Sequence, residues 1–252
     1  MQLKKFHELK INELISNIIT IAKDNNGCRF LQQKMDEMPP KVIMSIFQQI
    51  IPNINELCND PFGNYFVQKL IELLPKENIF IIINSIQTNF ANIATHAYGT
   101  RVIQKLLEID DMDVIKVLCK YMSMNLLDYF LNPNSIHIIQ KIVFNLFPFS
   151  MFIYECIYVN MIPISMDKNG CCILQKCIDQ SRDKNQFMII VLNNILLYIT
   201  DQYANYVLQY LVGLKDQMFI NNVIRLIVQN IMIFSKHKFS SNVLEKVNFF
   251  LI

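Results

Sequence analysis

The sequence predicts an all-α fold in which about seven helical repeats of about 36 residues stack into a curved right-handed solenoid. Three observations predict it. One segment recurs along the whole chain, each copy has helical periodicity, and no copy can bury its apolar face alone. We therefore expect residues 1–252 to form a single repeat array.

The recurring segment is centred on a glutamine. Its copies are GCRFLQQK, FGNYFVQKLIE, YGTRVIQKLLE, NSIHIIQKIV, NGCCILQKCID, YANYVLQYLV and FSSNVLEKV. The central residues are Gln32, Gln68, Gln104, Gln140, Gln175, Gln209 and Glu245, and successive spacings are 36, 36, 36, 35, 34 and 36. Spacing this regular indicates tandem repeats, which we number 1 to 7.

Each copy predicts an amphipathic helix. In repeat 2 the apolar residues Phe66, Val67, Leu70 and Ile71 share one helical face, and polar residues occupy the other. Apolar stretches such as 42–51 and 114–122 lie between the copies and predict a second longer helix in each repeat. A short connector completes the unit.

A small residue precedes the central position by five residues in every copy. The set is Gly27, Gly63, Gly99, Ser135, Gly170, Ala204 and Ser240. Something must approach the start of each helix closely. A neighbouring repeat and a bound ligand explain this equally well.

Composition excludes several classes of protein. Apolar residues make up 52% of the chain and the net charge is +2. No apolar run approaches the roughly 20 residues of a membrane helix, and the N-terminus is too polar for a signal peptide. The seven cysteines and four histidines show no metal-ligand spacing, and no catalytic constellation is present. We expect a monomeric cytoplasmic protein that is not an enzyme and has no cofactor, no metal and no membrane partner.

The polar face carries a repeated triplet: the central residue and the residues four and three positions before it. Helical geometry brings these three side chains together. The first members are Cys28, Asn64, Thr100, Ile136, Cys171, Asn205 and Ser241. The second members are Arg29, Tyr65, Arg101, His137, Cys172, Tyr206 and Asn242. Five of these second members are aromatic or guanidinium groups that can stack on a base, and the amides can bond a base edge.

A lysine follows the central residue directly in five repeats. These residues, the basic stripe, are Lys69, Lys105, Lys141, Lys176 and Lys246. We expect them to attract a polyanion despite the low net charge. An ordinary solvated helix face would explain lysine alone, but it gives no reason for six glutamines in one position.

These strings resemble the repeats of the Pumilio (PUF) family of RNA-binding proteins, in the order of its repeats 1 to 7 and over roughly residues 10–252. GNYFVQK, GTRVIQK, GCCILQK and SSNVLEK are the most telling. The resemblance implies a crescent, a superhelix related to armadillo arrays, whose concave face binds single-stranded RNA. Two side chains of each repeat would contact a base edge and the third would stack between bases.

The family's reading rule can be applied to the triplets. It implies uracil at Asn64 with Gln68 and at Asn205 with Gln209. It implies adenine at Cys28 with Gln32, Thr100 with Gln104 and Cys171 with Gln175. It implies guanine at Ser241 with Glu245, since a carboxylate only accepts and guanine offers two adjacent donors. Because RNA runs antiparallel to the protein in this family, the expected site is 5′-GUANAUA-3′.

Three departures from the family pattern stand out. Ile136 leaves Gln140 as the only polar reader of repeat 4, so its base is written N, with uracil favoured. Cys172 replaces a flat stacking group. An eighth repeat and a full C-terminal cap are expected and absent from the sequence, which suggests an incomplete chain.

The resemblance further implies post-transcriptional regulation, namely translational repression through mRNA 3′-UTR elements. Decay or translation-repression factors would bind the convex face. Two alternatives remain open. One is a nucleolar PUF-like protein of low base specificity in ribosome biogenesis, and the other is an armadillo- or HEAT-like scaffold that binds a protein segment.

Overall fold

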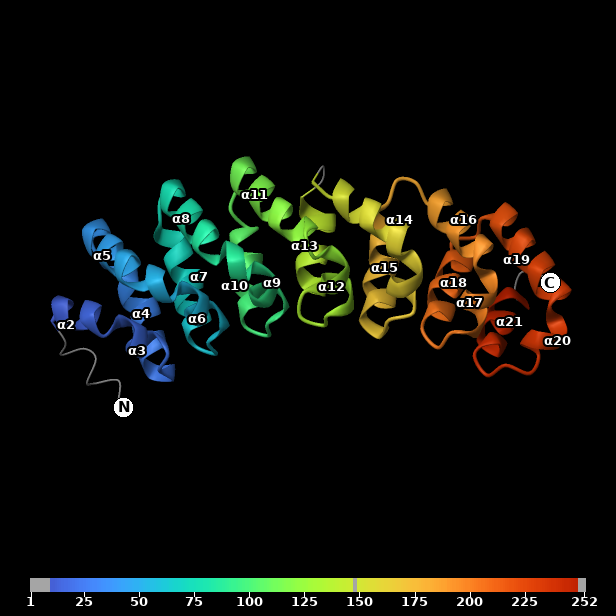
Figure 1. Cartoon of the computed structure of the whole chain (residues 1–252), viewed down its shortest axis with the longest axis horizontal. Coiled ribbons are helices and arrows are strands. Elements are labelled where there is room, and N and C mark those ends of the chain that lie inside the picture. Colours follow the sequence, from blue (N-terminus) through green and yellow to red (C-terminus); the bar gives the residue numbers. More distant parts are fainter. Residues whose placement is uncertain (1–9, 147–148, 249–252) are drawn as a thin grey trace. The chain divides into compact units, whose positions relative to one another are not determined.

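The structure, a computed structural model, describes residues 10–146 and 149–248, and every regular element in these ranges is a helix (Figure 1). The chain divides into two compact units, the first ending at Asn125 and the second beginning at Leu126. Within each unit, helices from successive repeats pack against one another. The predicted all-α helical-repeat fold is confirmed.

The first unit contains α2 (Ile11–Ser16), α3 (Ile18–Ala22), α4 (Asn25–Met35), α5 (Pro40–Ile50), η1 (Ile51–Asn53), α6 (Ile54–Asn59), α7 (Gly63–Leu73), α8 (Lys76–Ile86), η2 (Gln87–Asn89), α9 (Phe90–Thr95), α10 (Gly99–Leu106) and α11 (Met112–Ser123). The second unit contains α12 (Leu126–Leu131), α13 (Ile136–Asn145), α14 (Met151–Ser165), α15 (Lys168–Gln180), α16 (Asn185–Asn193), α17 (Ile195–Thr200), α18 (Ala204–Gly213), α19 (Gln217–Gln229), α20 (Ile231–Phe234) and α21 (Ser240–Asn248).

One repeat is a short helix, a central helix that carries the triplet, and a third helix, as in α6, α7 and α8. The predicted connector is therefore itself helical. The central helices are α4, α7 and α10 in the first unit and α13, α15, α18 and α21 in the second. Their apolar faces form the core, where Phe66, Val67 and Leu70 are completely buried.

An asparagine marks the joint between successive repeats. Asn17, Asn53, Asn89, Asn160, Asn194 and Asn230 have φ between −127° and −108° and ψ between 10° and 26°, which breaks the helical path. The side chain of Asn194 donates to the Ile190 carbonyl at 2.8 Å and so caps the preceding helix. These asparagines recur with the period of the glutamines, a signal that the triplets alone did not reveal.

The small residue at the start of each central helix faces the short helix of its own repeat. A Cβ added to Gly170 would lie 2.3 Å from the Ile164 carbonyl oxygen, and one added to Gly27 would lie 2.4 Å from that of Ile21. In repeat 4 the Ser135 hydroxyl instead donates to the Tyr129 carbonyl at 2.9 Å. The close approach thus comes mainly from the short helix of the same repeat, and at Gly99 also from the preceding repeat, where Asn59 Oδ1 would lie 2.3 Å from an added Cβ.

None of the helices in the described part of the chain has the length and apolar character needed to cross a lipid bilayer. All seven cysteines carry free thiols, and only Cys172 is exposed.

Replacing Gly170 by Ala should lower the free energy of unfolding by about 1–3 kcal/mol, because a rigid carbonyl occupies the space of the new methyl group. Gly213→Ala is the matched control, since nothing lies within 4 Å of its added Cβ. This second change should stabilise the helix by up to about 1 kcal/mol. Urea unfolding followed by circular dichroism measures both, and equal effects would contradict the proposed role of the close contact.

Candidate nucleic-acid interface

The central helices lie side by side within each unit and bring the predicted triplets together. In the first unit α7 packs between α4 and α10, so the triplets of repeats 1 to 3 are neighbours. In the second unit α13, α15, α18 and α21 pack in succession and align those of repeats 4 to 7.

The predicted stacking residues are all exposed. Tyr206 keeps 52% of its surface accessible and Tyr65 keeps 42%, which is unusual for large aromatic side chains in a packed helical protein. The whole exposed set is Arg29, Tyr65, Arg101, His137, Cys172, Tyr206 and Asn242.

The predicted base-edge residues at the first triplet position are mostly not exposed, which corrects the sequence interpretation. Cys28, Asn64, Thr100, Cys171 and Asn205 are buried, Ile136 is half-buried and Ser241 is exposed. The cause is their place in the first helical turn. The Asn64 amide turns back to donate to the Asp60 and Pro61 carbonyls at 2.8 and 3.1 Å.

The central glutamines are half-buried, and in five repeats the same bond orients them. Nε2 of the glutamine donates to the residue four positions before it. Gln68 bonds Asn64 Oδ1 at 3.0 Å and Gln209 bonds Asn205 Oδ1 at 2.8 Å. Equivalent bonds join Gln32 to Cys28 Sγ at 3.2 Å, Gln104 to Thr100 Oγ1 at 3.4 Å and Gln175 to the Cys171 carbonyl at 3.2 Å. The first member therefore orients the glutamine amide, through its side chain in repeats 1, 2, 3 and 6 and through its backbone carbonyl in repeat 5.

Repeat 4 does not follow this arrangement. Ile136 has no side-chain acceptor, and Gln140 Oε1 instead accepts a hydrogen bond from Lys176 Nζ of the next repeat at 3.1 Å. In repeat 7 the central Glu245 is exposed, as are both other members of its triplet.

Two of the predicted stacking residues of the first unit touch each other. Arg101 donates from a guanidinium nitrogen to the Tyr65 hydroxyl at 3.2 Å, and its guanidinium carbon lies 5.9 Å from the centre of the tyrosine ring.

A cavity of about 450 Å³ lies on the same face of the second unit. It is lined by Cys171, Cys172, Gln175, Tyr206, Gln209, Tyr210 and Lys246. These residues include the predicted readers of repeats 5 and 6 and a lysine of the basic stripe. Its volume is within the range of ligand-binding pockets.

In the first unit the basic stripe is an ion-pair ladder. Lys69 lies 2.6 Å from Asp36 and 3.4 Å from Glu72, while Lys105 lies 2.7 Å from Glu72 and 3.3 Å from Glu108. The hydrogen bond from Lys105 lowers the pKa of Glu72, so this carboxylate is ionised at neutral pH. The positive charge of Lys69 and Lys105 is therefore partly balanced by carboxylates, and their role as a basic stripe stays a prediction.

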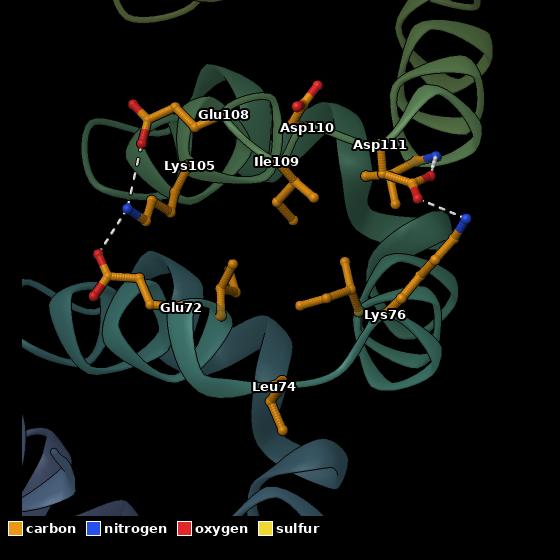
Figure 2. Close-up of a pocket in the computed structure, with 11 residues that line it drawn as sticks. Glu72, Leu74, Lys76, Lys105, Glu108, Ile109, Asp110 and Asp111 are labelled. Atoms are coloured by element: carbon orange, nitrogen blue, oxygen red, sulfur yellow. Dashed lines mark hydrogen bonds and ion pairs between the residues drawn. The ribbon is translucent and has the colours of Figure 1, made fainter.

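Figure 2 shows one step of this ladder at the edge of a cavity of about 440 Å³ between repeats 2 and 3. Lys105 bridges Glu72 and Glu108 on one side, and Lys76 pairs with Asp111 at 2.6 Å on the other. The acidic partners of these lysines were not predicted from the sequence. The sequence pattern that could have identified them is an acidic residue four positions after the central glutamine, present at Asp36, Glu72, Glu108 and Asp179.

Repeat 6 makes the corresponding contact with the acid of the preceding repeat, but through Tyr210 in place of a lysine. Its hydroxyl donates to Asp179 of the preceding repeat, and burial followed by this bond raises the pKa of Tyr210 to about 12. The acidic position is occupied by Phe144 in repeat 4 and by Gly213 in repeat 6. Lys176 and Lys246, the lysines of repeats 5 and 7, therefore have no carboxylate at this position of the preceding repeat to pair with.

Family models match both parts of the chain. The NOP9-like PUF repeat domain matches residues 12–109, and the Pumilio-family RNA-binding repeat matches residues 160–191, 194–213 and 230–247.

Curated relatives include Pumilio homolog 12 of Arabidopsis thaliana, 33% identical over 118 residues, which are 46% of this chain and 20% of that protein. Suppressor protein MPT5 of Saccharomyces cerevisiae is 36% identical over 122 residues, which are 45% of this chain and 14% of that protein. The chain thus matches about a fifth or less of the length of these relatives.

Solved structures match more completely. The RNA-binding domain of yeast Puf5p bound to AAT2 RNA is 31% identical with a TM-score of 0.82, covering 96% of this chain and 70% of that one. The Puf4 RNA-binding domain, bound to the 3′-UTR recognition sequence of HO endonuclease RNA, is 30% identical with a TM-score of 0.78. That match covers 90% of this chain and 73% of the other. With its repeats and fold in agreement with these proteins, the chain belongs to the Pumilio (PUF) family, whose members are RNA-binding proteins and not enzymes.

Proposed function

We propose that this chain binds single-stranded RNA sequence-specifically, one base per repeat, at a site of the form 5′-GUANAUA-3′. The observation that carries the proposal is the regular alternation of an exposed stacking group and a half-buried glutamine whose amide is already oriented by the residue beneath it. Orienting a reader in advance lowers the entropic cost of binding.

The hydrogen bonds of the readers support this assignment. In repeats 2 and 6 the asparagine holds one amide hydrogen of the glutamine, which leaves Oε1 to accept from N3–H of uracil. The second amide hydrogen can donate to a uracil oxygen. In repeat 7 the carboxylate of Glu245 accepts from the two adjacent donors of guanine.

Stacking supplies much of the affinity in this proposal. The exposed faces of Tyr65 and Tyr206 each accommodate a base, and such a contact contributes about 1–3 kcal/mol. The cavity bounded by Tyr206 and Cys172 provides space for a base between repeats 5 and 6.

The biological role proposed is post-transcriptional regulation of mRNA through 3′-UTR elements in the cytoplasm. Puf4 and Puf3 domains, which this chain resembles, are described in complex with 3′-UTR recognition sequences. Decay or translation-repression factors are the expected protein partners.

A second candidate is RNA binding of low base specificity in ribosome biogenesis in the nucleolus. The match of residues 12–109 to a NOP9-like PUF repeat domain favours it. The neutralised lysines of the first unit give no preference between the candidates, whereas the oriented readers favour base selection.

The direct test is fluorescence anisotropy of the 252-residue chain with labelled UGUAUAUA RNA and with UCUAUAUA, at one fixed salt concentration. We expect the change from guanine to cytosine to weaken binding more than tenfold, about 1.4 kcal/mol. Equal affinity for both would favour the second candidate. Absence of binding to either would contradict RNA recognition by this chain and favour a protein-binding scaffold.

Replacing Glu245 by Gln should remove the preference for guanine, because an amide offers one donor and one acceptor where the carboxylate offers only acceptors. Affinity for UGUAUAUA should fall about tenfold or more, while UAUAUAUA should bind equally or better. The same anisotropy assay measures both. Unchanged guanine selectivity would show that repeat 7 does not read this base.

Replacing Glu72 by Gln should strengthen binding to every RNA sequence alike, because it releases Lys69 and Lys105 from a shared carboxylate. Each additional phosphate contact should steepen the slope of log K against log salt by about 0.7. Glu77→Gln is the control, because it makes the same change of charge on α8, the third helix of the same repeat, and not on the central helix. A salt dependence that is identical in the two variants would contradict the role of the ladder.

A further inference from the structure

In repeat 4 the central Gln140 is held by its amide oxygen, whereas the glutamines of the other five repeats are held by their amide nitrogen. In five repeats Nε2 of the glutamine donates inward to the residue four positions before it. In repeat 4 Ile136 has no side-chain acceptor, and the bond that Gln140 makes instead runs from Lys176 Nζ to Gln140 Oε1 at 3.1 Å. A lysine ammonium has three donors and no acceptor, so only the oxygen of Gln140 can face it.

The position of Lys176 follows from two neighbouring residues of this chain. Phe144 occupies the place where repeats 1 and 2 carry the acid that pairs with the next repeat's lysine. Cys172 lies four residues before Lys176 on the same helical face and is small where other repeats carry arginine or tyrosine. The exposed Lys176 therefore meets Gln140 and not a carboxylate.

The two side chains together offer donors to a base. Gln140 Oε1 is engaged by Lys176, which leaves the Nε2 hydrogens, and the ammonium retains further hydrogens of its own. Adjacent donors fit a base edge with adjacent acceptors. Among the four Watson–Crick edges only that of cytosine has this feature, at N3 and O2, whereas uracil presents N3–H between its two oxygens.

We propose that repeat 4 reads cytosine, with Lys176 of repeat 5 acting as its second reader in place of Ile136. The inference rests on the proposed function and replaces the unassigned base, so that the preferred site becomes 5′-GUACAUA-3′. It also replaces uracil, which the sequence alone favoured at this position. The positive charge next to cytosine O2 complements the partial negative charge of that oxygen.

The test is a panel of four labelled RNAs, UGUANAUA with N as A, C, G or U, titrated by anisotropy at fixed salt. The RNA with cytosine should bind about tenfold more tightly than the RNA with uracil. UCUACAUA, with its guanine changed, is measured beside them. Loss of binding to this fifth RNA shows that the guanine is read, independently of what repeat 4 does.

Lys176→Met should abolish the cytosine preference while the variant still binds the panel. Lys246→Met is the matched control, because it removes the lysine at the same position in repeat 7. That control should weaken binding to all four RNAs by a similar factor and keep cytosine first. A general phosphate contact at Lys176 would behave like the control.

Ile136→Asn provides a gain of function. It restores the asparagine of repeats 2 and 6, which can orient Gln140 in the usual sense and should move the preference to uracil.

A uracil preference in the unchanged chain that persists in Lys176→Met would overturn the inference and leave the proposed function intact. If none of the RNAs bound, or the guanine change had no effect, the proposed function would fail and the inference with it.

Discussion

The contact on which the repeat depends is the approach of a small residue to the last carbonyls of the short helix before it. At Gly170 the space that a methyl group needs is already filled by the Ile164 carbonyl, while Ser135 bonds the equivalent carbonyl of Tyr129. This contact brings the central helix close against the short helix. The triplet begins one residue later, so the same contact determines which side chains of the first turn are buried and which face solvent.

The burial of the first triplet member changes its physical role. Asn64 has no accessible surface, yet its amide donates to the Asp60 and Pro61 carbonyls and accepts a hydrogen bond from Gln68. The bond from Gln68 fixes the amide orientation of that glutamine. A buried polar residue whose hydrogen bonds are satisfied in this way is well suited to selecting one arrangement of its neighbours.

The ion pairs have a structural consequence in the first unit. Lys69 and Lys105 each bridge two carboxylates, one of them in the preceding repeat, and so link successive repeats along the edge of the stack. Exposed pairs of this kind contribute at most about 1 kcal/mol each. Their larger effect is on the electrostatic field, because a lysine paired at short range attracts phosphates less than an unpaired one. The basic character of the face therefore differs from repeat to repeat, although the lysine positions do not.

The sequence by itself determined the number of repeats, their helical nature and the exposure of the residues predicted to stack. These properties are local, because helical geometry relates residues three and four positions apart whatever surrounds them. Tertiary structure decided the burial of Asn64 and Asn205, which depends on the short helix packed against each first turn. It also decided the partner of each lysine and which amide atom of Gln140 is hydrogen-bonded. Asp36 lies about one repeat before Lys69 in the sequence, and Gln140 lies about one repeat before Lys176. Only the packing of one repeat on the next brings such residues within bonding distance.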